Sequence, residues 1–122
     1  VIGGLRKVRV PFTTNGVGQA AALASLGAHD QMVARVAEVV AERTRVTNRI
    51  GQLGLDVVES DANFVWLPLG EYAAVLGEYC ERAGVVLRPF PGVGVRITIG
   101  TPAENDRLLS VVGAAIDDGA TG

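Results

Sequence analysis

The sequence predicts an α+β fold, a small two-layer sandwich in which helices cover one face of a mostly antiparallel sheet of about four strands. Two observations predict it. Stretches with helical and with strand periodicity mix without strict alternation, in the order helix, helix, strand, strand, helix, strand, strand, helix. The chain has 122 residues, of which 48% are hydrophobic. That length and composition suit one domain with one modest core.

The first third of the chain is predicted to be mainly helical. Residues 1–16 are typical of an irregular or extended lead-in, because Pro11 and the following Thr, Thr, Asn and Gly interrupt any strand. Residues 17–26 form a short, Ala-rich helix, with Asn15 as its N-cap and Gly27 as its stop.

A long amphipathic helix follows over residues 31–53. Its apolar residues recur at alternating steps of four and three, and only Arg43 interrupts the row. Glu42 can pair with Arg45 or Arg49 on the polar face. The apolar row consists of Met32, Val36, Val39, Val46, Ile50 and Leu53.

The rest of the chain is predicted to contain four strands and two helices. Short apolar or β-branched runs predict strands at residues 56–59, 64–68, 85–88 and 95–100. The strand at 64–68 lacks polar alternation, which predicts cover on both of its faces. Helical periodicity predicts helices at residues 71–83 and 102–117.

The sequence contains no repeat or internal linker, and it divides into a connector with a short helix, residues 1–28, and a small α+β domain, residues 29–122. The only methionine is Met32, and the chain opens at Val1. We therefore expect a piece of a longer polypeptide, produced by design or by proteolysis.

Composition excludes several classes of function. The net charge of -2 and the absence of a basic stripe argue against a nucleic-acid surface. No apolar run approaches the roughly 18 residues of a membrane span, and no signal-peptide pattern is present. A single cysteine excludes an intrachain disulfide and fits a reducing compartment, so we expect a cytoplasmic protein.

Most candidate motifs lack the neighbouring elements or residues that their function requires. Residues 16–21, GVGQAA, match a dinucleotide-binding pattern, but no strand precedes them. His29 has no second ligand at metal-binding spacing, and Cys80 lies on an apolar helical face that predicts a core position. No serine has a nucleophile-elbow context, and the acidic residues are scattered. We therefore assign no metal ligand and no catalytic residue.

Arg96 is the main candidate for a ligand-binding residue. Residues 95–100 alternate β-branched apolar side chains with Arg96, Thr98 and Gly100, so the guanidinium projects from the opposite face in mid-strand. Directly afterwards, Thr101 and Glu104 form a capping box that starts a helix. A cation fixed on a rigid strand beside such a corner is suited to bind an anion.

Arg88 is the second candidate. It ends the strand before the turn, so both guanidiniums come close to each other if the two strands pair. The alternative is a surface arginine that stacks on Phe90 or pairs with Asp61.

Residues 96–106, RITIGTPAEND, resemble the C-terminal signature of fold-type-I, pyridoxal-phosphate-dependent aminotransferases. The similarity is greatest to the histidinol-phosphate aminotransferase branch, which includes aromatic or phenylalanine aminotransferases. Three further segments are similar to this family in kind and order. These are residues 9–21, with RVPFTTN and QAA, residues 61–65, DANFV, and residues 84–90, GVVLRPF.

This resemblance implies a C-terminal small domain whose Arg96 binds the α-carboxylate of an amino-acid substrate and whose Arg88 contacts its distal group. It implies an enzyme that transfers an amino group between an aromatic amino acid or histidinol phosphate and 2-oxoglutarate, as a homodimer with pyridoxal 5'-phosphate. Family members bind that cofactor through a Schiff-base lysine, and Lys7, the sole lysine, matches no such position. The fragment alone is therefore expected to bind no cofactor and to be inactive.

Two alternatives from other classes stay open. The chain could be a stand-alone α+β module that binds a small carboxylate through Arg96, or a dimerisation module. An upstream lysine in the parent reading frame would favour the enzyme.

Overall fold

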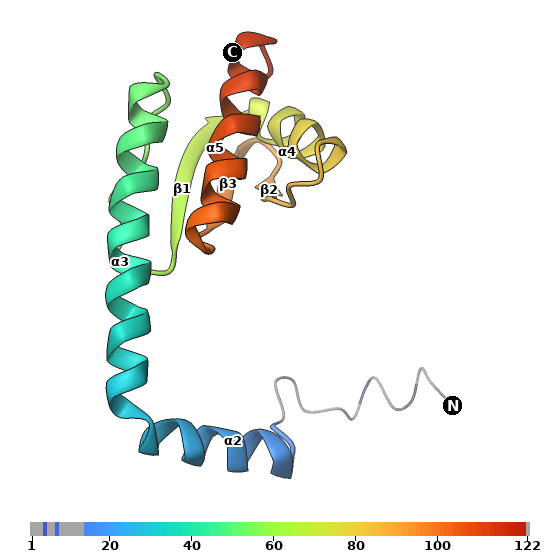
Figure 1. The fold of residues 1–122 in the computed structure, drawn as a ribbon. Helices are drawn as coiled ribbons and strands as arrows, with labels where there is room; N and C mark the ends of the chain where they lie inside the picture. Colours follow the sequence, from blue (N-terminus) through green and yellow to red (C-terminus); the bar gives the residue numbers. More distant parts are fainter. Residues whose placement is uncertain (1–3, 5–6, 8–13, 122) are drawn as a thin grey trace. The chain divides into compact units, whose positions relative to one another are not determined.

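A computed structural model describes Gly4, Lys7 and residues 14–121. The chain divides into two compact units, Val1–Ala34 and Arg35–Gly122. In chain order the elements are α2 (Gly16–Gly27), α3 (His29–Gln52), β1 (Phe64–Gly70), α4 (Tyr72–Arg82), β2 (Arg88–Phe90), β3 (Val93–Thr98) and α5 (Pro102–Asp117). The predicted α+β class is confirmed, and all strands lie in the second unit (Figure 1).

The first unit contains α2 and the start of α3. Asn15 caps α2 as predicted, because its side-chain oxygen accepts a hydrogen bond from the Gly18 backbone N–H at 2.8 Å. The predicted extended lead-in over residues 1–16 lies mostly outside the described residues. Gly4 and Lys7, which are described, have helical rather than extended backbone.

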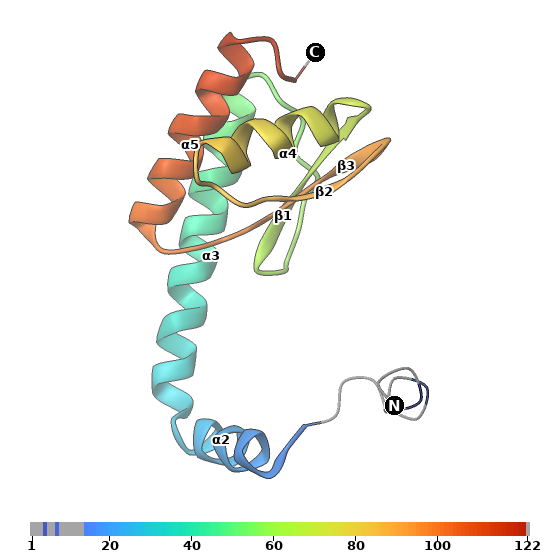
Figure 2. The same cartoon turned by 90° about the vertical axis from the view of Figure 1, so that its right-hand side faces the viewer.

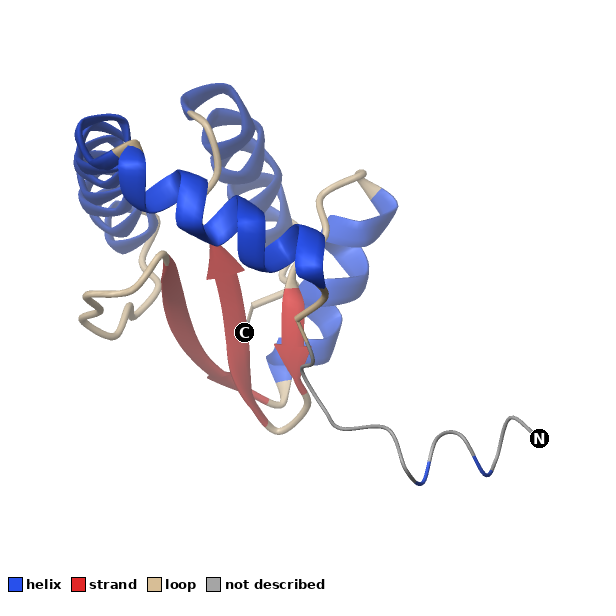
Figure 3. Ribbon diagram, turned by 90° about the horizontal axis from the view of Figure 1, so that it is seen from below, coloured by secondary structure: helices blue, strands red, loops and turns tan. Residues whose placement is uncertain are grey.

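The second unit is built on an antiparallel sheet of three strands in the order β1-β3-β2 (Figure 3). The prediction of about four strands was wrong at residues 56–59. Only Val58 forms a bridge there, and its N–H donates to the Trp66 carbonyl at 3.0 Å. β1 therefore has a full partner, β3, along one of its edges and a single bridge along the other.

The strand predicted at residues 85–88 is displaced toward the C-terminus. The Val85 N–H donates to the Cys80 carbonyl at 2.8 Å, and Gly84 has a φ of 78°, so this segment ends α4 instead of joining the sheet. β2 starts only at Arg88 and extends to Phe90, where the sequence predicted a turn.

The core lies between one face of the sheet and the helices. Burial alternates along both long strands, with Val65 and Leu67 of β1 and Val95 and Ile97 of β3 almost fully buried. The predicted cover on both faces of residues 64–68 was therefore wrong. The helices α3, α4 and α5 complete the core on one side (Figure 2) with Val46, Ile50, Leu76, Cys80, Leu108 and Val112.

The apolar row of α3 is buried only toward its C-terminal end. Val46 and Ile50 are inaccessible to solvent, whereas Met32 and Val36 are 44% and 56% exposed. The periodicity therefore predicted the helix correctly but not where its burial begins.

Gly94 of β3 lies close to β1, and this contact makes the sheet pairing testable. A Cβ built on Gly94 would lie 2.6 Å from Cζ2 of Trp66 and would also meet the Leu67 carbonyl oxygen. We predict that Gly94→Ala lowers the free energy of unfolding by about 2 kcal/mol, because overpacking displaces β3 from β1. Urea unfolding followed by the fluorescence of Trp66, the sole tryptophan, measures the change. Gly51→Ala, which meets no atom within 4 Å, is the matched control. Equal stability of the two variants would contradict the prediction.

Candidate functional site

The sheet face that points away from the helices carries aromatic and cationic side chains. We call it the outer face, and it is formed by β1 and β3 residues that alternate with the core residues and by the β2 residues paired beside them. Because burial alternates along β1 and β3, the same alternation that fills the core places these residues together. The outer face comprises Phe64, Trp66, Arg88, Phe90, Gly94 and Arg96.

Arg96 occupies the centre of the outer face. It lies on the middle strand, opposite Trp66 of β1 and opposite Arg88 of β2. Its guanidinium carbon lies 5.5 Å from the centroid of the Phe64 ring, a cation–π distance. Its Nε is buried and has no hydrogen-bond partner among the described residues. A buried donor without an acceptor costs free energy, so the Nε of Arg96 is an unsatisfied polar group in the centre of the outer face.

Arg88 lies beside it, as the predicted pairing of the two strands requires. Its guanidinium carbon lies 5.4 Å from the centroid of the Phe90 ring, and that ring packs against Trp66 at 5.4 Å between centroids. Stacking on Phe90, the alternative that the sequence left open, is thus the contact observed. Neither Arg88 nor Arg96 forms an ion pair with any described residue. The outer face therefore presents two cations in register without an internal counter-charge.

The corner that follows β3 is fixed by the predicted capping box. Glu104 accepts hydrogen bonds from the backbone N–H and the hydroxyl of Thr101, at 2.7 and 2.8 Å, and Pro102 opens α5. The hydrogen bond from the Thr101 backbone, followed by that from its hydroxyl, lowers the pKa of Glu104. These hydrogen bonds therefore fix the backbone of the short connection between β3 and α5.

Asn105 is a positioning residue that the sequence analysis did not identify. It is 1% exposed, and its side-chain amide binds both backbone groups of Gly100, with the carbonyl oxygen and the NH2 each at 3.0 Å. The same NH2 donates to Glu42 at 2.7 Å. An amide can satisfy a donor and an acceptor at once, which an apolar residue at this helical position could not. The resemblance included Asn105 in its signature, and the structure gives it a physical role.

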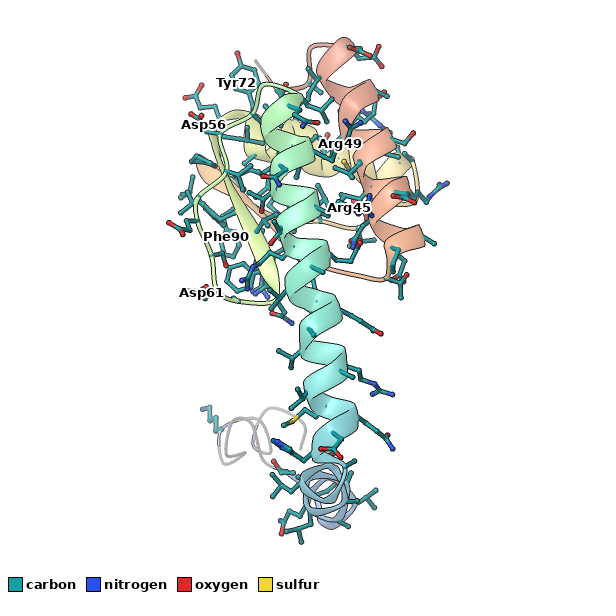
Figure 4. The ribbon with its side chains drawn as sticks, turned by 60° about the vertical axis from the view of Figure 1, so that its left-hand side comes forward. Arg45, Arg49, Asp56, Asp61, Tyr72 and Phe90 are labelled. Atoms are coloured by element: carbon teal, nitrogen blue, oxygen red, sulfur yellow. The ribbon has the colours of Figure 1, made fainter. Side chains whose placement is uncertain are left out.

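Glu42 and Arg45 connect this corner to α3. Arg45 donates to both carboxylate oxygens of Glu42, at 2.9 and 2.8 Å, and to Asp106 at 2.7 Å. Figure 4 shows Arg45 pointing from α3 toward α5. The pKa of Glu42 is lowered by its hydrogen bonds from Arg45 and then from Asn105, and the pKa of Arg45 is raised by Glu42 and then by Asp106. Arg49, the other predicted partner of Glu42, donates instead to Gln52 at 2.8 Å.

Other reactive side chains contribute no site. Within the described residues, no group of three His, Cys, Asp or Glu side chains could hold a metal ion. Cys80 is buried as predicted, and this burial raises its pKa to about 11, which keeps the thiol protonated and unreactive. In the same described part of the chain, no helix has both the length and the apolar character needed to cross a bilayer.

Comparison with known proteins identifies the family. Residues 1–112 match the family model described as aminotransferase class I and II. An aromatic amino acid aminotransferase of Rhodococcus opacus is 51% identical over 110 residues, which are 90% of this chain and 31% of that protein. One from Rhodococcus erythropolis is 46% identical over the whole chain and 34% of its own length. The chain thus spans about a third of the curated relatives it matches.

The fold agrees with a solved structure. The histidinol-phosphate aminotransferase of Sinorhizobium meliloti, in complex with pyridoxal-5'-phosphate, matches 94% of this chain with a TM-score of 0.77 and 27% identity. The match covers 34% of that protein.

The Glu42 network predicts a specific acid sensitivity. The pKa of Glu42 lies below its ordinary value of 4.5 in the folded chain, so the unfolded chain takes up the proton first as the pH falls. The stabilisation is therefore complete above about pH 4.5 and is lost as the pH falls further. Arg45→Met removes the largest cause of the shift, and we expect its free energy of unfolding to decline less steeply with acid.

Urea titrations at a series of acidic pH values measure this slope. Arg49→Met is the matched control, since Arg49 contacts Gln52 and not Glu42, and it should keep the wild-type slope. Identical slopes in wild type and Arg45→Met would show that the network has no linkage to acid stability.

Proposed function

The chain belongs to the class I and II aminotransferase family, and we propose that it is the C-terminal, substrate-carboxylate-binding domain of a pyridoxal-phosphate-dependent aminotransferase. The observation that carries the proposal is the state of Arg96. Its guanidinium is held on an aromatic ring in the centre of the outer face, and its buried Nε lacks an acceptor. A carboxylate offers two acceptor oxygens in one plane, which matches the fork of N–H groups on an arginine.

In this proposal, Arg96 binds the α-carboxylate of the amino-acid substrate and of the 2-oxo acid. Because β3 is the middle strand and is packed on the core, the guanidinium has little freedom to follow a misplaced ligand. A fixed two-point contact orients the rest of the substrate, which is the contribution to rate that a binding residue can make. Arg88, on the neighbouring strand, is placed to contact an acidic distal group such as a phosphate.

The cofactor, when bound, supplies the electron sink for transfer of the amino group. The N-termini of α5 and α2 do not fit its phosphate. Glu104 already accepts from the N-terminus of α5, and Asn15 accepts from that of α2, so neither helix end is open to an anion. We propose that the cofactor is held by the part of the parent enzyme that corresponds to the two thirds of the relatives not spanned here.

The substrate class follows from the relatives and the outer face together. The curated relatives are named aromatic amino acid aminotransferases, and the structural neighbour is named a histidinol-phosphate aminotransferase. Trp66 and Phe90 provide ring surfaces beside Arg96, and Arg88 provides a second cation. We propose an aromatic amino acid or histidinol phosphate as amino donor, 2-oxoglutarate as acceptor, and a homodimeric parent enzyme.

The carboxylate role is tested by Arg96→Lys in the full-length parent. Lysine retains the charge but loses the planar fork, so we predict that KM for the amino-acid substrate rises about tenfold or more. Affinity for the cofactor, followed by its absorbance during dialysis, should not change. Arg49→Lys, on an exposed helical surface, is the control and should behave as wild type.

Unchanged KM in Arg96→Lys would refute the carboxylate role. A parent that binds carboxylates through Arg96 but transfers no amino group would instead support the alternative of a carboxylate-binding module.

The distal-group role is tested by Arg88→Met in the same parent. A methionine preserves much of the packing on Phe90 but removes the cation. We predict that kcat/KM for histidinol phosphate falls about tenfold, while kcat/KM for phenylalanine changes by less than about twofold. An equal fall for both substrates would place Arg88 in the support of the sheet and not in recognition of the distal group.

A further inference from the structure

We propose that Arg43 of α3 is a positioning residue for Arg96, acting through the loop that leads into β1. The inference rests on the proposed function for its kinetic consequence but not for its structural one. Arg43 interrupts the apolar row of α3, and it contacts neither the outer face nor any residue of β3 in the hydrogen bonds and ion pairs of the described residues.

The side chain of Arg43 is largely buried and holds the chain just before β1. It is 14% exposed, and its Nη1 donates to the Ala62 carbonyl at 2.7 Å. Its ion pair with Asp61 is long, at 3.6 Å, and the Asp61 side chain is fully exposed, so that pair contributes little. The hydrogen bond to the carbonyl is charge-assisted and part-buried, so it contributes more to fixing the loop than the ion pair does.

Two short steps connect this loop to Arg96. The carbonyl of Asn63, the next residue, accepts a hydrogen bond from the Ile99 N–H at 2.9 Å. Phe64 follows, pairs with Thr98, and places its ring 5.5 Å from the guanidinium carbon of Arg96. Because the Nε of Arg96 has no acceptor, its cation–π contact with the Phe64 ring orients this side chain among the described residues.

Glu42, the residue of α3 before Arg43, holds the segment that follows β3 at the same end of the sheet. Glu42 binds Asn105, which in turn holds both backbone groups of Gly100 after β3. In Figure 4, Asp61 lies on one side of α3 and Arg45, the partner of Glu42, on the other. Consecutive residues thus hold the start of β1 and the end of β3. Loss of Arg43 should therefore release Phe64 while β3 itself stays fixed.

The structural test uses the chain labelled with 15N-arginine. The Nε–H signal of Arg96, assigned by its absence in Arg96→Lys, should carry a ring-current shift from Phe64. We expect Arg43→Met to move it toward the position of exposed arginines, and Arg49→Met to leave it in place. Asp61→Asn should also leave it in place, since the exposed ion pair is not the fixing contact. An unmoved signal in folded Arg43→Met would overturn the proposal.

If Arg43→Met does not fold, Arg43→Lys takes its place, because lysine keeps one hydrogen-bond donor. A partial shift of the Arg96 signal in Arg43→Lys supports the proposal, and no shift overturns it.

The kinetic test is a double-mutant cycle in the full-length parent. Arg43→Met should raise KM for phenylalanine about tenfold but should have little effect in an Arg96→Lys background, because coupled residues are not additive. Reaction with phenethylamine, which lacks the α-carboxylate, should not change. Equal effects in both backgrounds would show a merely structural role and overturn the proposal. If the NMR signal moves but Arg96→Lys leaves KM unchanged, Arg43 still positions Arg96 and the proposed carboxylate function fails instead.

Discussion

The alternation of buried and outward residues along β3 is the constraint on which the site depends. Val95 and Ile97 are 0% and 1% exposed, so Arg96 between them must project from the outer face. A slip by one residue would bury the guanidinium and expose both β-branched side chains, which is prohibitively unfavourable. Because β1 and β2 pair with β3 in a fixed register, Trp66 and Arg88 are brought to either side of Arg96. The geometry of the outer face is thus a consequence of how the core is filled.

Burial sets the direction of Arg96, but polar contacts set the position of its strand. The corner after β3 is held by Asn105, whose amide satisfies both backbone groups of Gly100. Glu42 fixes that amide, and Arg45 neutralises Glu42 while also reaching Asp106 of α5. Asn105 is buried and both Glu42 and Arg45 bind to partners, so the inner end of this network is satisfied, while Asp106 at its outer end is 67% exposed. It joins α3, α5 and the sheet at the one corner that borders the site.

Much of this arrangement could be predicted from the sequence, and the failures have physical causes. The capping box at Thr101 and the alternation around Arg96 are local signals, and both are confirmed. The strand expected at residues 85–88 does not form as predicted, because the Val85 N–H donates to the Cys80 carbonyl at the end of α4. The hydrogen bonds of Asn105 and Arg43 could not be predicted, because Asn105 binds the carbonyl of Gly100 across a corner and Arg43 binds the carbonyl of Ala62 in a distant loop. Whether Arg88 and Arg96 bind a ligand stays a prediction.

The outer face carries two neighbouring positive charges. Arg88 and Arg96 lie directly opposite each other, and like charges in that position repel. No described carboxylate offsets them, since Asp61 pairs with Arg43 and Glu42 with Arg45. The aromatic rings beneath both guanidiniums reduce the repulsion only in part. In the proposed function, an anionic ligand bound beside the two guanidiniums would relieve this repulsion. If the proposed function holds, removal of this repulsion contributes part of the binding energy for a carboxylate.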